Sequence, residues 1–157
     1  MKTREINNIC GQLTLQQWTL DDQLINTHTV YNSIALEGRR LVARLFNKDA
    51  AGGEIQRVNK IGLGSSQDGF KPDQITLIDK VGETPIAKVE EVQVTDANGT
   101  PRIALRLTGE LGKDEVNYPL REAGLFTEDG VMYNRVTFDT ITKSSQFKLT
   151  LVWEITF

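Results

Sequence analysis

The chain has 157 residues, of which 39% are hydrophobic and 25% are charged, and its formal net charge is −3 at pH 7. This length suits one folded domain with a core of its own, and the composition is that of a globular protein. The acidic balance offers no basic field to a phosphate backbone, and no apolar run approaches the roughly 20 residues that cross a bilayer, so we expect neither nucleic-acid binding nor membrane insertion.

The first residues predict an N-terminal arm. Residues 1–12 are mostly polar, with only Ile6 and Ile9 as apolar anchors. Such a segment either orders on a partner or is a frayed end. No apolar segment of a secretion signal follows Met1, and the single cysteine, Cys10, cannot form an internal disulfide. We therefore expect a chain that is made and kept in the cytoplasm.

The next segment predicts two antiparallel strands, 13–20 and 23–30. Apolar residues alternate in the first strand, and the alternation slips at Gln16-Gln17, which is what a β-bulge leaves in a sequence. His28, the only histidine, falls in the second strand. We interpret it as a sheet-face residue rather than as a metal ligand or a catalytic base.

A helix is predicted to follow, with Asn32 or Ser33 as its cap. Apolar residues at positions 34, 41, 42, 45 and 46 form one stripe about four turns long. Gly38 within this stripe predicts the close approach of another element. Three arginines lie off the stripe and favour an interface salt-bridge set or a solvated face over a phosphate-binding patch: Arg39, Arg40 and Arg44.

The middle of the chain predicts a strand, a loop and a hairpin. After a flexible, glycine-rich stop at 49–53, residues 58–63 are typical of a buried strand, and a polar loop begins at Gly64. Residues 64–85 together mix polar and apolar side chains, and we expect a long loop there that orders on contact with a partner. Strands over 87–95 and 102–109 form a hairpin around Asn98-Gly99. The first of them slips phase at Glu90-Glu91, and the second has its predicted inner face at Ile103, Leu105 and Leu107.

The C-terminal third predicts a three-stranded meander over 121–127, 131–140 and 146–157. Ala123 and Gly124 lie between apolar neighbours, so we expect another backbone to pack against them. In the last strand every odd position is large and apolar, which predicts one continuous buried face: Phe147, Leu149, Leu151, Trp153, Ile155 and Phe157.

About eight strands and one helix together favour a mainly β fold. We expect an antiparallel β-sandwich with one amphipathic helix, forming a single domain over 13–157 behind a polar N-terminal arm over 1–12.

No pattern predicts a catalytic, cofactor or metal site. The glycine-containing run after the 58–63 strand has Gln67 where a dinucleotide fingerprint requires glycine. Asp96 begins a run similar to a calcium loop, but the glutamate ligand is missing and the turn explains the run. Glu122 and Glu154 have no electrophilic partner for work as paired carboxylates. We therefore expect a protein that is not an enzyme and needs no cofactor.

Several segments carry a family resemblance. The string Arg121-Glu122-Ala123-Gly124-Leu125-Phe126 is followed by an acidic-glycine turn, by a strand with Arg135 and Phe138, and by a last strand that ends in Val152-Trp153-Glu154-Ile155-Thr156-Phe157. Asn32 and the runs 38–46 and 61–64 precede them in the same order. Together they resemble a family of bacteriophage tail-fibre and baseplate attachment proteins that also occurs in contractile injection systems. The resemblance marks as fold-maintaining the residues Arg121, Glu122, Ala123, Gly124, Leu125, Phe126 and Trp153.

The resemblance implies a structural component of a tail that holds fibre or peripheral subunits to a baseplate. Its implied partners are other tail or baseplate proteins and fibre subunits, with multiple copies in each particle. The implied location is the virion tail, after assembly in the bacterial host cytoplasm.

The residues leave an alternative open, a carbohydrate-binding β-sandwich that recognises a host surface. Its candidate aromatic residues are Trp18, Tyr31, Tyr118 and Tyr133. A hydrolase is the least favoured class, because no nucleophile and base can be paired.

Overall fold

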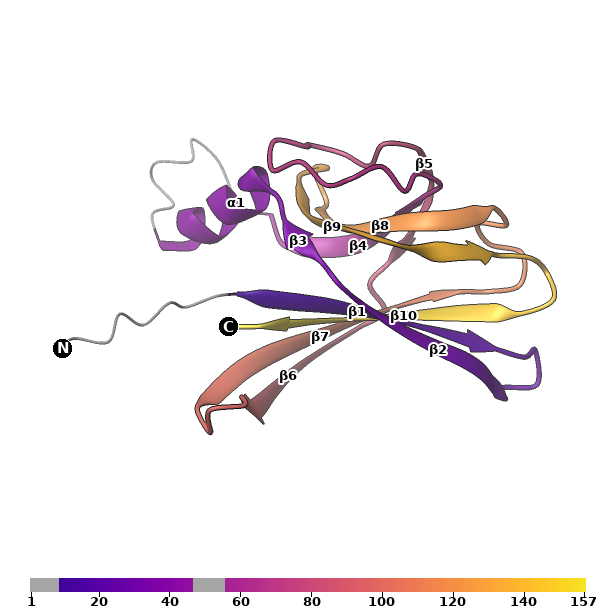
Figure 1. Ribbon diagram of the computed structural model, residues 1–157, viewed down its shortest axis with the longest axis horizontal. Helices are drawn as coiled ribbons and strands as arrows, with labels where there is room; N and C mark the ends of the chain where they lie inside the picture. The colour runs from indigo at the N-terminus through magenta and orange to yellow at the C-terminus, as the bar shows by residue number, and fades with distance from the viewer. Residues whose placement is uncertain (1–8, 47–55) are drawn as a thin grey trace.

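The computed structural model describes residues 9–46 and 56–157, and they form two five-stranded antiparallel sheets that face each other (Figure 1). Across sheet A the strands are β2 (Leu24–Tyr31), β1 (Cys10–Trp18), β10 (Lys148–Thr156), β7 (Pro101–Leu111) and β6 (Lys88–Thr95). Across sheet B they are β3 (Ser33–Ile34), β9 (Met132–Thr142), β8 (Pro119–Thr127), β4 (Val58–Gly64) and β5 (Lys80–Pro85). The predicted antiparallel β-sandwich is confirmed.

One helix, α1 (Leu36–Phe46), is present among the described residues. It lies at the end of the sandwich where the β6–β7 hairpin and the C-terminal end of β10 also lie (Figure 1). Among the described residues, no helix has both the length and the apolar character that are needed to cross a membrane.

The core lies between the two sheets, and β10 supplies its most regular wall. The buried positions of this strand are those that the alternation predicts: Leu149, Leu151, Trp153 and Ile155. The indole N–H of Trp153 donates to Asn32 Oδ1 at 2.8 Å, so a polar atom of the core has its partner. Phe157 is 42% exposed, so the predicted buried face was wrong at its last residue; β10 ends at Thr156.

Strand registers test the two predicted phase slips. The β1–β2 ladder shifts between Gln17 and Trp18, close to the predicted place, but the extra residue is Ile25 of β2 and β1 pairs with β10 without a shift, so the bulge predicted in the first strand lies in its partner. The β6–β7 ladder runs without a shift from Lys88 to Thr95, so the slip predicted at Glu90-Glu91 is wrong. Both glutamates lie on an edge strand, where side chains of either face reach solvent and a polar pair breaks no burial pattern.

The sequence did not predict two of the strands, β3 and β5. β3 has only two residues, Ser33 and Ile34, and these pair with β9 instead of capping the helix. The helix begins at Leu36, so the predicted caps were wrong. β5 lies within what the sequence suggested was a long loop after Gly64. Cys10 already belongs to β1, while residues 1–8 and the predicted stop at 49–53 lie outside the described residues.

Another backbone packs closely against Gly38 and Gly124, as predicted, which explains why both positions have no side chain. A Cβ built on Gly38 of α1 would lie 2.0 Å from the carbonyl oxygen of Tyr133, so the helix can rest directly on β9. A Cβ on Gly124 would lie 2.7 Å from the carbonyl oxygen of Asn134. Larger side chains at these positions would push the two backbones apart.

Candidate functional site

The motif strand β8 has two different faces. Ala123 and Leu125 point into the core between the sheets, while Phe126 packs on the opposite, outer face of sheet B. This outer face is covered by residues 65–79, which we call the cover segment. Its contacts with the sheet are apolar as well as polar: Leu77 and Phe70 pack against Phe126, with Met132 and Ala35 beside them.

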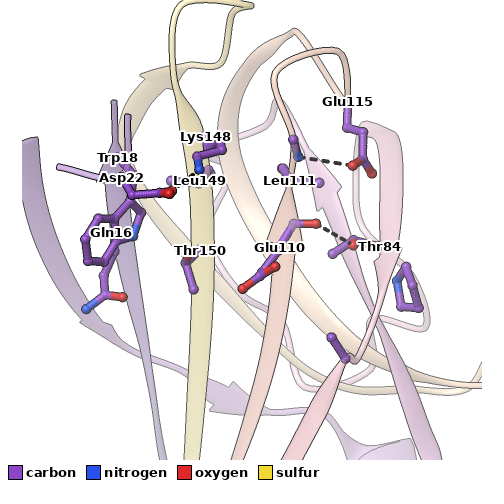
Figure 2. Close-up of a pocket in the computed structure, with 13 residues that line it drawn as sticks. Gln16, Trp18, Asp22, Thr84, Glu110, Leu111, Glu115, Lys148, Leu149 and Thr150 are labelled. Atoms are coloured by element: carbon purple, nitrogen blue, oxygen red, sulfur yellow. Dashed lines mark hydrogen bonds and ion pairs between the residues drawn. The ribbon is translucent and has the colours of Figure 1, made fainter. Parts of the chain in front are cut away.

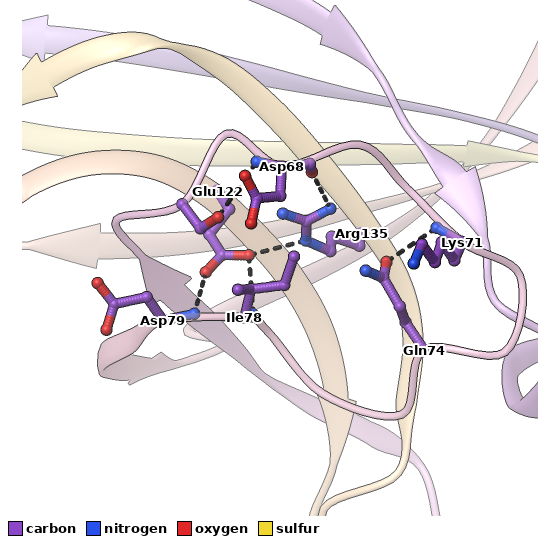
Figure 3. A network of polar contacts seen from close by, with 8 residues as sticks. Asp68, Lys71, Gln74, Ile78, Asp79, Glu122 and Arg135 are labelled. Atoms are coloured by element: carbon purple, nitrogen blue, oxygen red, sulfur yellow. Dashed lines mark hydrogen bonds and ion pairs between the residues drawn. The ribbon is translucent and has the colours of Figure 1, made fainter.

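A buried ion pair lies beneath the cover segment (Figure 3). Glu122 Oε2 and Arg135 Nε are 2.7 Å apart, and both side chains are 0% exposed. Because a charge removed from water is costly unless it is paired and hydrogen-bonded, the groups around the pair decide whether it is tolerated.

The cover segment supplies most of those groups. The backbone N–H groups of Ile78 and Asp79 donate to the two carboxylate oxygens of Glu122, at 3.2 and 2.7 Å. Arg135 Nη1 donates to the carbonyl oxygen of Asp68 at 2.8 Å, while its Nη2 has no partner among the described residues. The ion pair therefore fixes both ends of the cover segment to sheet B.

Arg121, the first residue of the motif, adds a further attachment. Its Nη1 donates to the carbonyl oxygen of Ser65 at 3.1 Å, and its Nε donates to Thr140 Oγ1 at 2.9 Å. The motif residues Arg121 to Phe126 thus hold the cover segment or fill the core. Sequence reasoning identified Arg135 within the family pattern but missed it as the partner of Glu122, because the two residues are 13 positions apart on different strands.

A mostly apolar hollow of about 470 Å³ lies beside α1, and we call it the α1 hollow. Its walls come from the helix, from the ends of both sheets and from the segment before β4: Leu41, Val42, Leu45, Gln56, Arg57, Val58, Val89, Leu105, Leu107, Tyr133 and Ile155. Leu45 is 65% exposed, Val89 is 60% exposed and the neighbouring Phe46 is 90% exposed. The predicted helix stripe is therefore only partly buried at its C-terminal end.

Tyr133 forms part of the wall of the α1 hollow. Its hydroxyl is buried and finds no hydrogen-bond partner among the described residues. Burial raises the pKa of this phenol to about 12, and the nearby positive charge of Arg39 opposes the increase. The hydroxyl therefore stays neutral over the whole physiological range.

The three candidate interface arginines lie on the exposed surface of α1. Arg39 and Arg44 are exposed, and so is Arg40, which forms an ion pair with Glu37 one turn earlier. They belong to the helix and do not join the β8 motif. None of the three lines the α1 hollow, although the charge of Arg39 reaches Tyr133 in its wall.

A second, more polar hollow of about 660 Å³ lies at the end of sheet A (Figure 2). Trp18 and Gln16 from β1, Thr150 from β10 and Glu110 from β7 line it, with an ion pair between Asp22 and Lys148 at its rim. The indole N–H of Trp18 is buried and has no partner among the described residues. The other aromatic candidates do not converge here: Tyr31 is 79% exposed, Tyr118 is 51% exposed and Tyr133 is buried.

Comparison with protein-family models, with curated proteins and with solved structures found no match. The function of this chain is therefore inferred from its own residues and surfaces.

The remaining chemical candidates have structural roles. Glu122 and Glu154 lie on different sheets, and Glu154 pairs with Arg106 at 2.8 Å. Asp96 Oδ1 accepts the backbone N–H groups of Asn98 and Thr100 and so closes the β6–β7 turn. Within residues 9–46 and 56–157, no three groups of the histidine, cysteine and carboxylate type are placed to hold a metal ion.

Proposed function

We propose that this protein is a structural component of a phage tail or of a related contractile injection apparatus. In that role it is a baseplate or tail-fibre adaptor, which holds fibre or peripheral subunits through its surface and turns over no substrate. The resemblance over Arg121 to Phe126, Trp153 and the preceding segments supports the class of protein. The α1 hollow is the observation that supports a binding role.

The α1 hollow has the properties of a contact surface for another protein. Its walls are mostly apolar, and two of the apolar residues that line it, Leu45 and Val89, are exposed. Contiguous apolar surface of this kind typically marks an interaction site, and an apolar anchor seated in a pocket supplies most of the binding energy of many interfaces. Arg57 lines the hollow and is exposed, and the charge of Arg39 reaches Tyr133 in its wall, so a partner with acidic residues around that anchor is favoured.

The cover segment is the alternative surface for a partner, and it is more rigid than the sequence suggested. The sequence suggested a long loop over 64–85 that orders on a partner, but β5 accounts for 80–85 and sheet B holds 65–79 from beneath. Ile75 is 68% exposed and Ile78 is 45% exposed on this segment. A partner that contacted them would meet a preformed surface, which lowers the entropy cost of binding.

Repeated use in a symmetric particle would strengthen each contact. Several copies of the adaptor, each with a modest affinity, hold a multimeric fibre or ring more tightly than one copy does, because later contacts form within the assembly. We therefore expect multiple copies in the virion tail, assembled in the host cytoplasm.

The test compares two substitutions of matched chemistry and exposure. Leu45→Asp places a charge on the rim of the α1 hollow, and Ile75→Asp places one on the cover segment. Each variant is supplied in place of the parent chain during the assembly of tail particles, and its incorporation is measured by quantitative mass spectrometry of purified particles. We expect Leu45→Asp to lose incorporation and Ile75→Asp to keep it, with both variants folded in isolation.

Two outcomes count against this proposal. Loss with Ile75→Asp alone would move the contact from the α1 hollow to the cover segment. Absence of the parent chain from purified tails would contradict the adaptor function itself.

The polar hollow favours one second candidate, a carbohydrate-binding module. An aromatic side chain beside amide, hydroxyl and carboxylate groups is a common arrangement for binding a sugar ring. A glycan array with the parent chain, Trp18→Ala and Tyr31→Ala tests it, because Tyr31 is a highly exposed aromatic outside the hollow. Binding that Trp18→Ala alone removes would support this function; an array without binding would contradict it.

A further inference from the structure

The open edges of the two sheets differ in their protection. An exposed edge strand invites pairing with another chain, and natural proteins prevent this with charges, with proline or with very short strands. On sheet A, the edge strand β6 carries Lys88, Glu90 and Glu91. On sheet B, β5 carries Lys80, Glu83 and Pro85. The opposite edge of sheet B consists of the two-residue β3, and β9 carries Asp139 beyond it.

The fourth edge, β2, has no charge, proline or short length to protect it; its one irregularity is the register shift at Ile25, and from Asn26 to Tyr31 it pairs regularly with β1. It is eight residues long, with the sequence Leu-Ile-Asn-Thr-His-Thr-Val-Tyr, and it contains no Lys, Arg, Asp, Glu or Pro. On one side it pairs with β1, and on the other side no described strand pairs with it. Leu24, Ile25 and Tyr31 are 50%, 56% and 79% exposed. A long, uncharged edge with exposed apolar residues is the kind that pairs with another strand.

The order of residues in β2 indicates which strand that is. Two apolar residues begin it, four polar residues occupy its middle and two apolar residues end it. This pattern reads the same in both directions, so β2 is complementary to itself when two copies run antiparallel. The apolar pair at 24–25 of one copy then lies beside the apolar pair at 30–31 of the other, and no charged side chain faces another.

We propose that β2 pairs antiparallel with β2 of a second copy of this chain, across a two-fold axis. Opposed residues in a ladder project to the same face, so the axis passes beside a residue near the middle, Thr27 or His28. The two copies of sheet A then form one continuous ten-stranded sheet, and each exposed edge N–H and C=O group of β2 gains a partner. This inference does not depend on the proposed tail function.

The outer face of β2 suits this pairing. Thr29 Oγ1 already lies 3.1 Å from Thr14 Oγ1 of β1, which is a hydrogen bond between threonines on neighbouring strands. Thr27 and Thr29 are exposed. With the axis beside His28, Thr27 of each copy faces Thr29 of the other, and with the axis beside Thr27 the two Thr27 residues face each other. Such cross-strand threonine pairs stabilise a ladder without any charge.

Sedimentation equilibrium of the full chain tests the pairing. A concentration series from about 1 µM to about 1 mM covers the affinities expected of standard and weaker interfaces. We expect the mean mass to rise from that of one chain toward that of two. A chain that stays monomeric over the whole series would overturn the proposal.

Matched lysine substitutions locate the surface. Thr27→Lys places two lysines close to each other across the axis in either register, so we expect dimerisation at least about tenfold weaker. Gln93→Lys puts the same charge on the exposed middle of β6, the opposite edge of sheet A, and should dimerise like the parent. Thermal unfolding confirms that both variants fold. A dimer that survives Thr27→Lys, or one that Gln93→Lys weakens equally, contradicts the β2 assignment.

Discussion

The outer faces of the two sheets place the same pair of groups in different surroundings. On sheet B, residues 65–79 cover Glu122 and Arg135, whose side chains are both 0% exposed. On sheet A, which no described element covers in Figure 1, Glu154 and Arg106 form a pair with side chains 21% and 43% exposed. The N–O distances are 2.7 and 2.8 Å. The N–O geometry of the two ion pairs is thus nearly the same, and the pairs differ in the access of water to their side chains.

That difference determines what each pair does. An exposed pair is screened by water and salt, and its contribution to the free energy of folding is about 0 to 1 kcal/mol. A buried pair contributes little net energy when intact, but removal of one partner leaves an uncompensated charge out of water. The buried pair therefore requires that the segment covering sheet B supply hydrogen-bond partners to both side chains. The exposed pair makes no such requirement, so the outer face of sheet A can contact solvent or a partner.

The largest expected effect lies in the core that both faces share. Trp153→Ala should reduce the free energy of unfolding by about 3 to 5 kcal/mol, because it leaves a cavity between the sheets. For a chain of this size the midpoint should fall by roughly 6 to 20 °C. Calorimetry measures it, and a midpoint within a degree or two of the parent would contradict the placement of Trp153 at the centre of the core.

The second prediction tests the comparison directly. Glu122→Ala should cost about 3 kcal/mol or more, because Arg135 would then remain buried without its carboxylate. Glu154→Ala should cost about 1 kcal/mol or less. Urea denaturation of the two variants gives both numbers. Hydrogen exchange should also increase at Ile78 and Asp79 in Glu122→Ala alone, since their N–H groups lose the acceptor. Equal losses of stability in the two variants would show that burial does not separate the two pairs.

The sequence predicted the sandwich because its signals are local. Alternation in β10 and the turns at Gly99 and Gly130, both of which have positive φ, are visible within about ten residues. The helix was visible in the same way, and so was the place of the register shift near Gln17, although the extra residue lies in β2 and not in β1.

The features that the sequence missed depend on distant residues. β3 pairs through only two residues, and β5 exists because β4 offers it an edge. No sequence pattern near Glu122 indicates that Arg135 will form an ion pair with it, or that two backbone N–H groups of the cover segment will donate to it. The α1 hollow likewise needs walls from both sheets and could not be read from the helix alone.

A third prediction concerns the backbone of the covered sheet. Gly124→Ala should cost about 1 to 3 kcal/mol, because the new Cβ would lie 2.7 Å from the carbonyl oxygen of Asn134, and a backbone atom cannot rotate away. Gly69→Ala is the matched control, since nothing lies within 4 Å of its Cβ position. Denaturant midpoints compare the two. A Gly124→Ala variant as stable as Gly69→Ala would contradict the tight packing of β8 against β9.

The smallest predicted effect on stability has the opposite sign, because the buried hydroxyl of Tyr133 has no partner among the described residues. Glu122 has donors for both of its oxygens, whereas the hydroxyl of Tyr133 has no partner among the described residues. Removal of the hydroxyl in Tyr133→Phe should therefore increase the free energy of unfolding by about 1 kcal/mol, where removal of Glu122 decreases it. Urea denaturation at pH 7 measures the change, and a loss of stability would mean that the hydroxyl has a favourable contact after all.

The same hydroxyl predicts a pH dependence with a definite sign. Burial raises the pKa of Tyr133 to about 12, above the ordinary tyrosine value of 10.0, so the folded state holds this proton more tightly than the unfolded state does. The resulting contribution to stability is complete below pH 10 and is lost as the pH rises toward 12. Tyr133→Phe lacks this loss, so the gap in stability between variant and parent should widen between pH 10 and pH 12. Parallel profiles for Tyr133→Phe and the parent would mean that water reaches the hydroxyl through the α1 hollow.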